Sequence, residues 1–295
     1  MTDKENKTYH EKISVGFNIE LPTMKSLFVE MYFGETLLSS GTAFLVARDN
    51  SSHCCLFTNR HNVTGRHQET GESISKLAAI PENILIYFHK QSDEPGSWIT
   101  VRLPLYRDDG SPYWFEHPEL GEIVDAVALN LSWGADVWKL PYYLEPGLDR
   151  HGLLVSPSEA VSVIGFPFGL SAAGKFPIWA TGSLAQDLSL LDSKKPFFLI
   201  DCRTRQGQSG SAVIAYRTSN SRKVVGDKVH STMSPNPIWE FLGIYAGRVN
   251  AESDLGRVWH VSAIEEIFKV AEKDSSERAA KAVLALQHDA PGSIQ

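Results

Sequence analysis

The chain has 295 residues, of which 42% are apolar and 21% charged, and this length suits one large domain or two smaller ones. Such a composition excludes a wholly disordered or fibrous protein. The net charge of −7 and the lack of any run of Lys and Arg argue against non-specific binding to nucleic acid, which needs a basic face.

The termini, apolar runs and cysteines indicate a cytoplasmic protein. The charged start MTDKENKTYHEK is unlike a secretory signal, and no apolar run is long enough to cross a membrane. Three cysteines, Cys54, Cys55 and Cys202, cannot form a disulfide framework. The adjacent pair also lacks the spacing of metal ligands. We expect reduced core thiols in a reducing compartment and no metal site.

Short runs of β-branched and aromatic residues, separated by turn residues, dominate the chain after a polar arm at 1–24. This pattern is typical of an all-β protein. The runs form two sets of six, joined by a linker at 140–152 that holds two prolines and two glycines. The first set is 27–33, 36–47, 54–58, 84–88, 98–103 and 124–131, and the second is 160–165, 178–186, 196–201, 211–216, 239–245 and 258–261. Two antiparallel six-stranded barrels would remove the exposed edges of so many strands.

Helical periodicity appears only at the end of the chain. Apolar residues recur at helical spacing over 261–273, and 274–287 is a second helical candidate. The helix could be a strap on the second barrel or a surface for a partner. The polar stretch 218–237 is expected to be an exposed, mobile loop. The predicted division is thus an arm (1–24), a first barrel (25–139), a linker (140–152), a second barrel (153–261) and a C-terminal helix and tail (262–295).

The segment RTRQGQSGSAV at 203–213 holds Ser209 between Gly207 and Gly210 on a predicted turn between two strands. Nucleophilic acyl transfer needs such a serine, because the glycines let a substrate approach closely. The backbone N–H groups of the turn, at Gly207, Gln208 and Ser209, are the candidate oxyanion donors. A plain tight turn would explain the same letters.

A serine hydroxyl needs a base, and the candidate is His61, just after the strand at 54–58. Asp125 opens the run VDAVALNL, where a buried carboxylate would have to be paired, and an imidazole N–H would supply the partner. Taken singly, His61 could be a surface histidine and Asp125 a strand-edge residue in water. The chain order of His61, Asp125 and Ser209 is that of chymotrypsin, whereas α/β-hydrolases and subtilisins use other orders.

Five segments together carry a family resemblance. FTNRHNV, DAVALNL and GQSGSAV resemble the T-A-x-H, D-x-A-x-L and G-x-S-G-G-P blocks of trypsin/chymotrypsin-fold (PA clan) serine peptidases, and VIGFPFGL and FLGIYAGR resemble two strands of the second barrel. The chain is nearer the bacterial, disulfide-free, high-temperature-requirement-like branch. The resemblance implies a serine endopeptidase that cleaves proteins or peptides through an acyl-enzyme, with no cofactor and with no nucleic-acid or membrane partner.

The same resemblance implies where substrate specificity is set. The specificity pocket would be formed by Arg203, Thr204, Tyr245, Ala246, Gly247 and Arg248. A guanidinium inside it would favour an acidic substrate residue. Alternatively, the arginines face solvent or pair with Asp201 and Glu240.

Three departures from the family pattern bear on regulation. Ser211 and Ala212 replace the family's Gly-Pro after the nucleophile. Gln208 stands where zymogen-type members have the aspartate that pairs with a newly cleaved N-terminus, so activation by N-terminal trimming is not expected. With the sequence ending at Gln295, no attached PDZ-type module is expected either. Control would come from the loops, the arm or an activating or sensor protein that triggers a latent enzyme. The competing hypothesis is a catalytically silent fold that acts as a protein-binding module.

Overall fold

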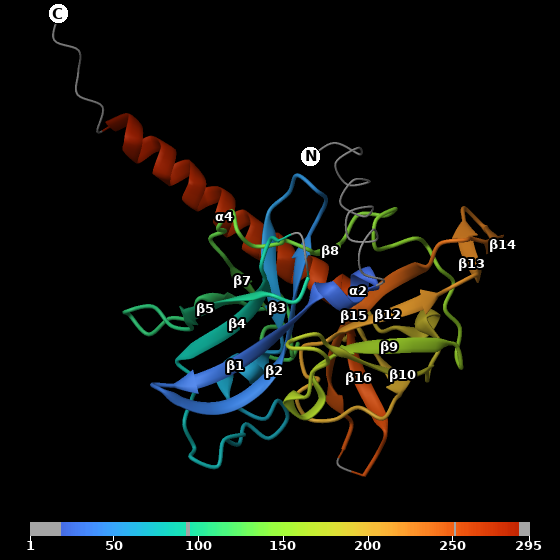
Figure 1. The fold of residues 1–295 in the computed structure, drawn as a ribbon, viewed down its shortest axis with the longest axis horizontal. Coiled ribbons are helices and arrows are strands. Elements are labelled where there is room, and N and C mark those ends of the chain that lie inside the picture. Colours follow the sequence, from blue (N-terminus) through green and yellow to red (C-terminus); the bar gives the residue numbers. More distant parts are fainter. Residues whose placement is uncertain (1–18, 93–94, 251, 289–295) are drawn as a thin grey trace, which may run out of the picture.

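The computed structural model describes residues 19–92, 95–250 and 252–288. Two groups of strands are followed by one long helix, α4 (Val261–His288), which projects beyond them (Figure 1). Most of the predicted arm, residues 1–18, lies outside the described residues. Its end forms a short helix, α2 (Leu21–Lys25), in which Met24 is buried.

Eight strands of the first half and the linker form one sheet in the order β5-β4-β1-β2-β3-β7-β6, with β8 paired in parallel to β2. Their bounds are β1 Ser26–Phe33, β2 Thr36–Ala47, β3 Cys54–Thr58, β4 Asn83–His89, β5 Trp98–Pro104, β6 Trp114–Phe115, β7 Val127–Asn130 and β8 Tyr142–Tyr143. Alternate side chains of β4, at Ile84, Ile86 and Phe88, are buried, so the sheet has one apolar face as the sequence pattern requires.

The second half is a closed barrel in the order β10-β11-β16-β15-β12-β9. Its strands are β9 Ala160–Gly165, β10 Ile178–Leu184, β11 Phe197–Asp201, β12 Ala212–Arg217, β15 Ile238–Arg248 and β16 Leu255–His260. Every neighbouring pair is antiparallel. Closure gives each strand two partners and leaves no long edge open.

The predicted all-β class with a C-terminal helix is confirmed, and each of the twelve predicted strands is present within a few residues of its expected bounds. The first half differs in one respect, because its strands pair as an open eight-stranded sheet and not as a closed six-stranded barrel. The end strand β6 has only two residues, and so it offers β5 at the other end little backbone to pair with.

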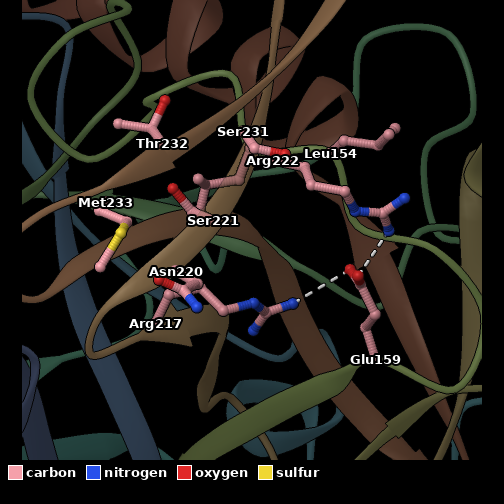
Figure 2. Close-up of a pocket in the computed structure, with 10 residues that line it drawn as sticks. Leu154, Glu159, Arg217, Asn220, Ser221, Arg222, Ser231, Thr232 and Met233 are labelled. Carbon is pink, nitrogen blue, oxygen red and sulfur yellow. Dashed lines mark hydrogen bonds and ion pairs between the residues drawn. The ribbon is translucent and has the colours of Figure 1, made fainter.

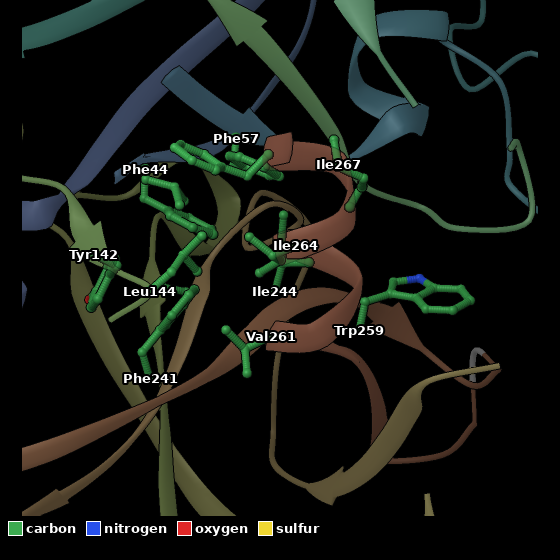
Figure 3. Close-up of a cluster of buried hydrophobic side chains, with 14 of the residues drawn as sticks. Phe44, Phe57, Tyr142, Leu144, Phe241, Ile244, Trp259, Val261, Ile264 and Ile267 are labelled. Atoms are coloured by element: carbon green, nitrogen blue, oxygen red, sulfur yellow. The ribbon is translucent and has the colours of Figure 1, made fainter. Parts of the chain in front are cut away.

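The two halves share a core, and α4 packs into it. Val261, Ile264, Ile267, Phe268 and Ala271 of the helix are at most 2% exposed and join one cluster with aromatic residues of both halves (Figure 3). The helix contacts β3 and β7 as well as β15 and β16, so it straps both halves, not only the second. One continuous helix spans both predicted stretches, and its residues from 276 to 283 are exposed.

A buried ion pair ties α2 to the linker. Lys25 Nζ lies 2.6 Å from Asp149 Oδ2, and the two side chains are 3% and 1% exposed. Trp239 Nε1 donates to the same carboxylate at 2.6 Å. Burial lowers the pKa of Lys25. A charge so deeply buried is tolerated only with a partner, and so these residues fix the start of the sheet against the linker.

The stretch predicted to be a mobile loop forms a hairpin instead. β13 (Asn220–Val225) pairs with β14 (Lys228–Met233) across a two-residue turn in which Gly226 has φ +63°. The alternation around Gly-Asp in VVGDKV is the signal of such a hairpin. All three cysteines lie in the described residues, each as a free thiol, as predicted. None of the described helices combines the length and the apolar character needed to span a membrane.

Candidate active site

His61 and Asp125 form a close pair. His61 Nδ1 lies 2.6 Å from Asp125 Oδ2, and the backbone N–H of His61 donates to Asp125 Oδ1 at 3.0 Å. Asp125 is 1% exposed, whereas the His61 side chain is 15% exposed. The carboxylate is therefore buried behind the imidazole, and both of its oxygens are bonded to the same histidine.

Strand pairing brings these two residues together. β3 ends at Thr58, which pairs with Val127 at the start of β7, so the residues after β3 lie beside those before β7. Asn59 then donates from Nδ2 to the Asp125 carbonyl at 2.5 Å. His61 follows in the short helix α3 (Arg60–Thr64), which Gly65 ends in a left-handed conformation. His61 and Asp125 are 64 positions apart in the chain, and the hydrogen bonds between β3 and β7 bring them together.

The turn that carries Ser209 is fastened to the first sheet next to His61. The Ser209 carbonyl accepts hydrogen bonds from the Thr42 backbone N–H at 3.0 Å and from Asn62 Nδ2 at 3.2 Å. Asn62 is the neighbour of His61 on α3. These contacts join the nucleophile candidate of one half to the base candidate of the other.

At two positions of this turn, backbone conformation and close neighbours favour glycine over every residue with a side chain. Gly207 has φ +92° and Gly210 has φ +87°, a region that favours glycine. A Cβ on Gly207 would collide with the Phe166 carbonyl oxygen, and one on Gly210 with the Thr42 carbonyl oxygen. The turn therefore approaches the neighbouring backbones as closely as glycine permits.

Of the three backbone N–H groups predicted to bind the oxyanion, two have no acceptor among the described residues and one is already hydrogen-bonded. Among the described residues, the backbone N–H groups of Gly207 and Ser209 have no acceptor. The Gln208 N–H donates to the Arg205 carbonyl at 3.2 Å, which removes it from the predicted set. The Gln208 side chain turns inward, where its Oε1 accepts from the Arg205 N–H at 2.7 Å.

The Ser209 hydroxyl makes no hydrogen bond to His61 or to another group within the described part of the chain. Catalytic hydrogen bonds are often long without substrate and tighten when it binds. His61 Nδ1 is occupied by Asp125, which leaves Nε2 as the imidazole nitrogen that can serve a hydroxyl on the adjacent turn.

Among the candidate specificity residues, Arg203 shares a carboxylate neighbour with the nearby Arg205. Arg203 and Arg205 both lie beside Asp254, at 3.9 and 3.7 Å, and the Arg203 side chain is 87% exposed. Their partner is thus Asp254, not the Asp201 or Glu240 considered from the sequence, and neither arginine supports an acidic preference.

Of the other five candidates, Thr204 precedes the turn, and Tyr245, Ala246, Gly247 and Arg248 belong to β15. Thr204 Oγ1 and Tyr245 Oη are hydrogen-bonded to each other in the interior. Ala246 lies in a bulge between residues paired with β16, where the register shifts between Tyr245 and Gly247. Arg248 ends the strand at the surface.

Sequence reasoning missed the residues that fasten the site. Thr42 on β2 holds both ends of the Ser209 turn, since its N–H bonds the Ser209 carbonyl and its Oγ1 donates to the Gly207 carbonyl at 2.9 Å. Asn62 Nδ2 also donates to Thr58 Oγ1, which in turn donates to the Thr42 carbonyl at 2.8 Å. The sequence signal for Thr42 is weak: it opens the otherwise apolar run at 42–47, where a buried hydroxyl needs a partner.

A cavity of about 530 Å³ lies at the far end of β12 from Ser209 (Figure 2). Glu159 is held there by two arginines, Arg217 at 3.2 Å and Arg222 at 2.5 Å. The other lining residues are Leu153, Leu154, Asn220, Ser221, Ser231, Thr232 and Met233. The hairpin β13–β14 forms one wall. None of these described lining residues belongs to the predicted site, so the cavity is separate from it.

Neither a protein-family model nor a curated protein sequence matches the chain. Among solved structures, it is similar to a serine-to-alanine mutant of Rv3671c from M. tuberculosis in its inactive form, at 17% identity over 86% of this chain and 91% of that one, with a TM-score of 0.43. It is also similar to the serine endoprotease from Yersinia pestis, at 12% identity over 88% and 69%, with a TM-score of 0.46. Identities this low leave the function to be argued from the site itself.

Proposed function

We propose that the chain is a serine endopeptidase with Ser209 as nucleophile, His61 as general base and Asp125 as the residue that orients the imidazole. One observation carries the proposal. The buried Asp125 carboxylate accepts hydrogen bonds from both the backbone N–H and Nδ1 of His61. A carboxylate in this position selects the tautomer with a proton on Nδ1 and stabilises the imidazolium formed during reaction.

The proposed reaction runs through an acyl-enzyme. His61 Nε2 takes the proton of Ser209 Oγ as that oxygen attacks the peptide carbonyl carbon. The N–H groups of Gly207 and Ser209, which have no acceptor among the described residues, stabilise the developing oxyanion. His61 then gives the proton to the leaving amine, the C–N bond breaks, and water repeats the sequence on the ester to release the acid.

A fluorophosphonate probe tests the nucleophile. The purified chain should be labelled covalently, and Ser209→Ala should abolish labelling while leaving the melting temperature within a few degrees, since the side chain is only partly buried. Mass spectrometry of peptides cut by the wild type and not by Ser209→Ala would then identify the preferred cleavage sites. Labelling that survives Ser209→Ala would contradict Ser209 as the nucleophile. Absence of labelling from the wild type under every condition tried would instead favour the silent binding module.

We further propose that the enzyme is cytoplasmic and latent until a partner triggers it. The three free thiols suit a reducing compartment. In the free chain the Ser209 hydroxyl has no hydrogen bond among the described residues, so a partner that tightens the Ser209 turn against His61 would raise activity. Peptide hydrolysis should therefore increase when cell extract is added. Full activity of the purified chain on unstructured protein, unchanged by extract, would contradict latency.

A further inference from the structure

The side chain that precedes a cleaved bond is attached one carbon away from the carbonyl that Ser209 attacks. It must therefore lie within a few ångströms of the Ser209 turn. β15 forms one side of that space at Tyr245, whose carbonyl accepts the Gly210 N–H at 3.1 Å and whose N–H donates to the Ser211 carbonyl at 2.9 Å. Tyr245 is thus the β15 residue whose backbone is bonded to the two residues that follow the nucleophile candidate.

The Tyr245 ring fills the interior beside this turn. Its side chain is 2% exposed, and its Cε2 lies 2.6 Å from where a Cβ on Gly256 of β16 would stand. The lack of a side chain at Gly256 is what makes room for the ring. Ile200 of β11 also borders the same point, at 3.3 Å. The phenol is therefore wedged between two strands of the barrel, and no solvent-accessible space surrounds it.

Thr204 lies at the hydroxyl end of the Tyr245 ring. It is 0% exposed, and its Oγ1 is hydrogen-bonded to Tyr245 Oη. Each hydroxyl satisfies the other, whereas a buried hydroxyl without a partner is costly. A large substrate side chain entering here would have to displace the ring and break this bond, and a small side chain would do neither.

We propose that Tyr245 and Thr204 close the space for the substrate side chain preceding the cleaved bond, so that the enzyme cleaves after small residues such as glycine, alanine and serine. This rests on the proposed peptidase function and specifies its substrate class. The preference comes from occupied volume, not from charge, which agrees with Arg203 and Arg205 both lying beside Asp254.

The test is a set of otherwise identical peptides with alanine, phenylalanine, arginine or glutamate before the cleaved bond. A single misfit methylene in a tight pocket changes selectivity by about 10–200-fold, so kcat/KM for alanine should exceed that for phenylalanine by about 100-fold or more. Tyr245→Ala should lower this ratio by at least about tenfold by admitting the phenyl ring. Tyr245→Phe keeps the ring and should keep the preference.

Fluorophosphonate labelling reports separately on whether each variant retains an intact nucleophile. A wild type that cleaves after phenylalanine or arginine as fast as after alanine would overturn the proposal, as would a labelled Tyr245→Ala enzyme with an unchanged ratio. If Tyr245→Ala fails to fold, the wild-type profile and Tyr245→Phe still decide. A wild type that is neither labelled nor active would overturn the peptidase function itself, which is a different result from a peptidase with the wrong preference.

Discussion

The Asp125 carboxylate lies almost entirely out of water, so hydrogen bonds within the protein must stabilise its charge. It receives two from one histidine, and this has a directional consequence. The backbone bond fixes where the carboxylate stands relative to α3, and the bond from Nδ1 then fixes the plane of the ring. The side chain of a water-exposed aspartate could rotate freely, whereas the buried Asp125 holds the imidazole in a single orientation.

Asp125→Asn tests that orientation. An amide in place of the carboxylate no longer selects the Nδ1–H tautomer, and the equivalent change in a catalytic triad lowers kcat by about 10⁴-fold with the geometry intact. We expect a loss of that order in kcat, measured by steady-state peptide hydrolysis, with KM little changed. Asp254→Asn, an exposed carboxylate with two arginine neighbours, is the matched control and should retain activity within about twofold. A loss below tenfold for Asp125→Asn would argue against the assigned role.

Residue types, their places at strand ends and on a turn, and their chain order were together enough to select Ser209, His61 and Asp125 as candidates. They were not enough to find Asn62 or Thr42. Asn62 bonds Ser209, which lies 147 residues further along the chain, and Thr42 bonds Gly207, which lies 165 residues further along. A threonine or asparagine is chemically unremarkable in sequence, and only the approach of the two halves gives it a function.

At the scale of elements, the local sequence pattern predicted the positions of the strands but not how distant strands pair. The twelve strands were predictable because β-branched and aromatic runs end in turn residues. The hairpin β13–β14 was mistaken for a loop because its strands are mostly exposed and polar, so that only the Gly226–Asp227 turn marked it. The open edge of the first sheet also escaped prediction, since which strands pair depends on contacts between distant segments.

The helix α4 offers a test of what stabilises the fold at this scale. Phe268 is fully buried in the shared core, and truncating such a side chain costs about 3–5 kcal/mol. Phe268→Ala should therefore lower the free energy of unfolding by that amount in urea titration. Val283→Ala, on the same helix but 55% exposed, should change it by less than about 0.5 kcal/mol. Equal effects of the two would mean that α4 is not packed as described.

At the scale of the whole molecule, two groups of aromatic side chains join the two halves in addition to the hydrogen bonds at the Ser209 turn, and both matter for the site. Phe44 of the first sheet packs on Tyr142 of the linker and Phe241 of the barrel, with ring centroids 5.6 and 5.5 Å away. A second contact joins His89 and Trp98 of the first sheet to Phe176 between β9 and β10. Since Ser209 belongs to one half and His61 to the other, their approach depends on these contacts.

The second contact contains an acid-sensitive group. His89 is 2% exposed, neither ring nitrogen has a hydrogen-bond partner among the described residues, and burial lowers its pKa to about 4. Between the unfolded pKa of 6.5 and this value, the unfolded chain binds more protons than the folded one, so stability is present above pH 6.5 and is lost as the pH falls toward 4. A difference of this size corresponds to about 3 kcal/mol.

Urea unfolding between pH 7 and pH 4 should therefore show a free energy of unfolding that falls on acidification. His89→Phe keeps an aromatic ring between Trp98 and Phe176 but cannot take up a proton, and so it should reduce that fall by about 3 kcal/mol or less. His260, whose pKa burial also lowers to about 4, would account for part of the remainder. His230→Phe, at an exposed position of β14, is the control and should leave the pH dependence as in the wild type. An acid slope that His89→Phe leaves unchanged would show that protonation of His89 does not contribute to the loss of stability on acidification.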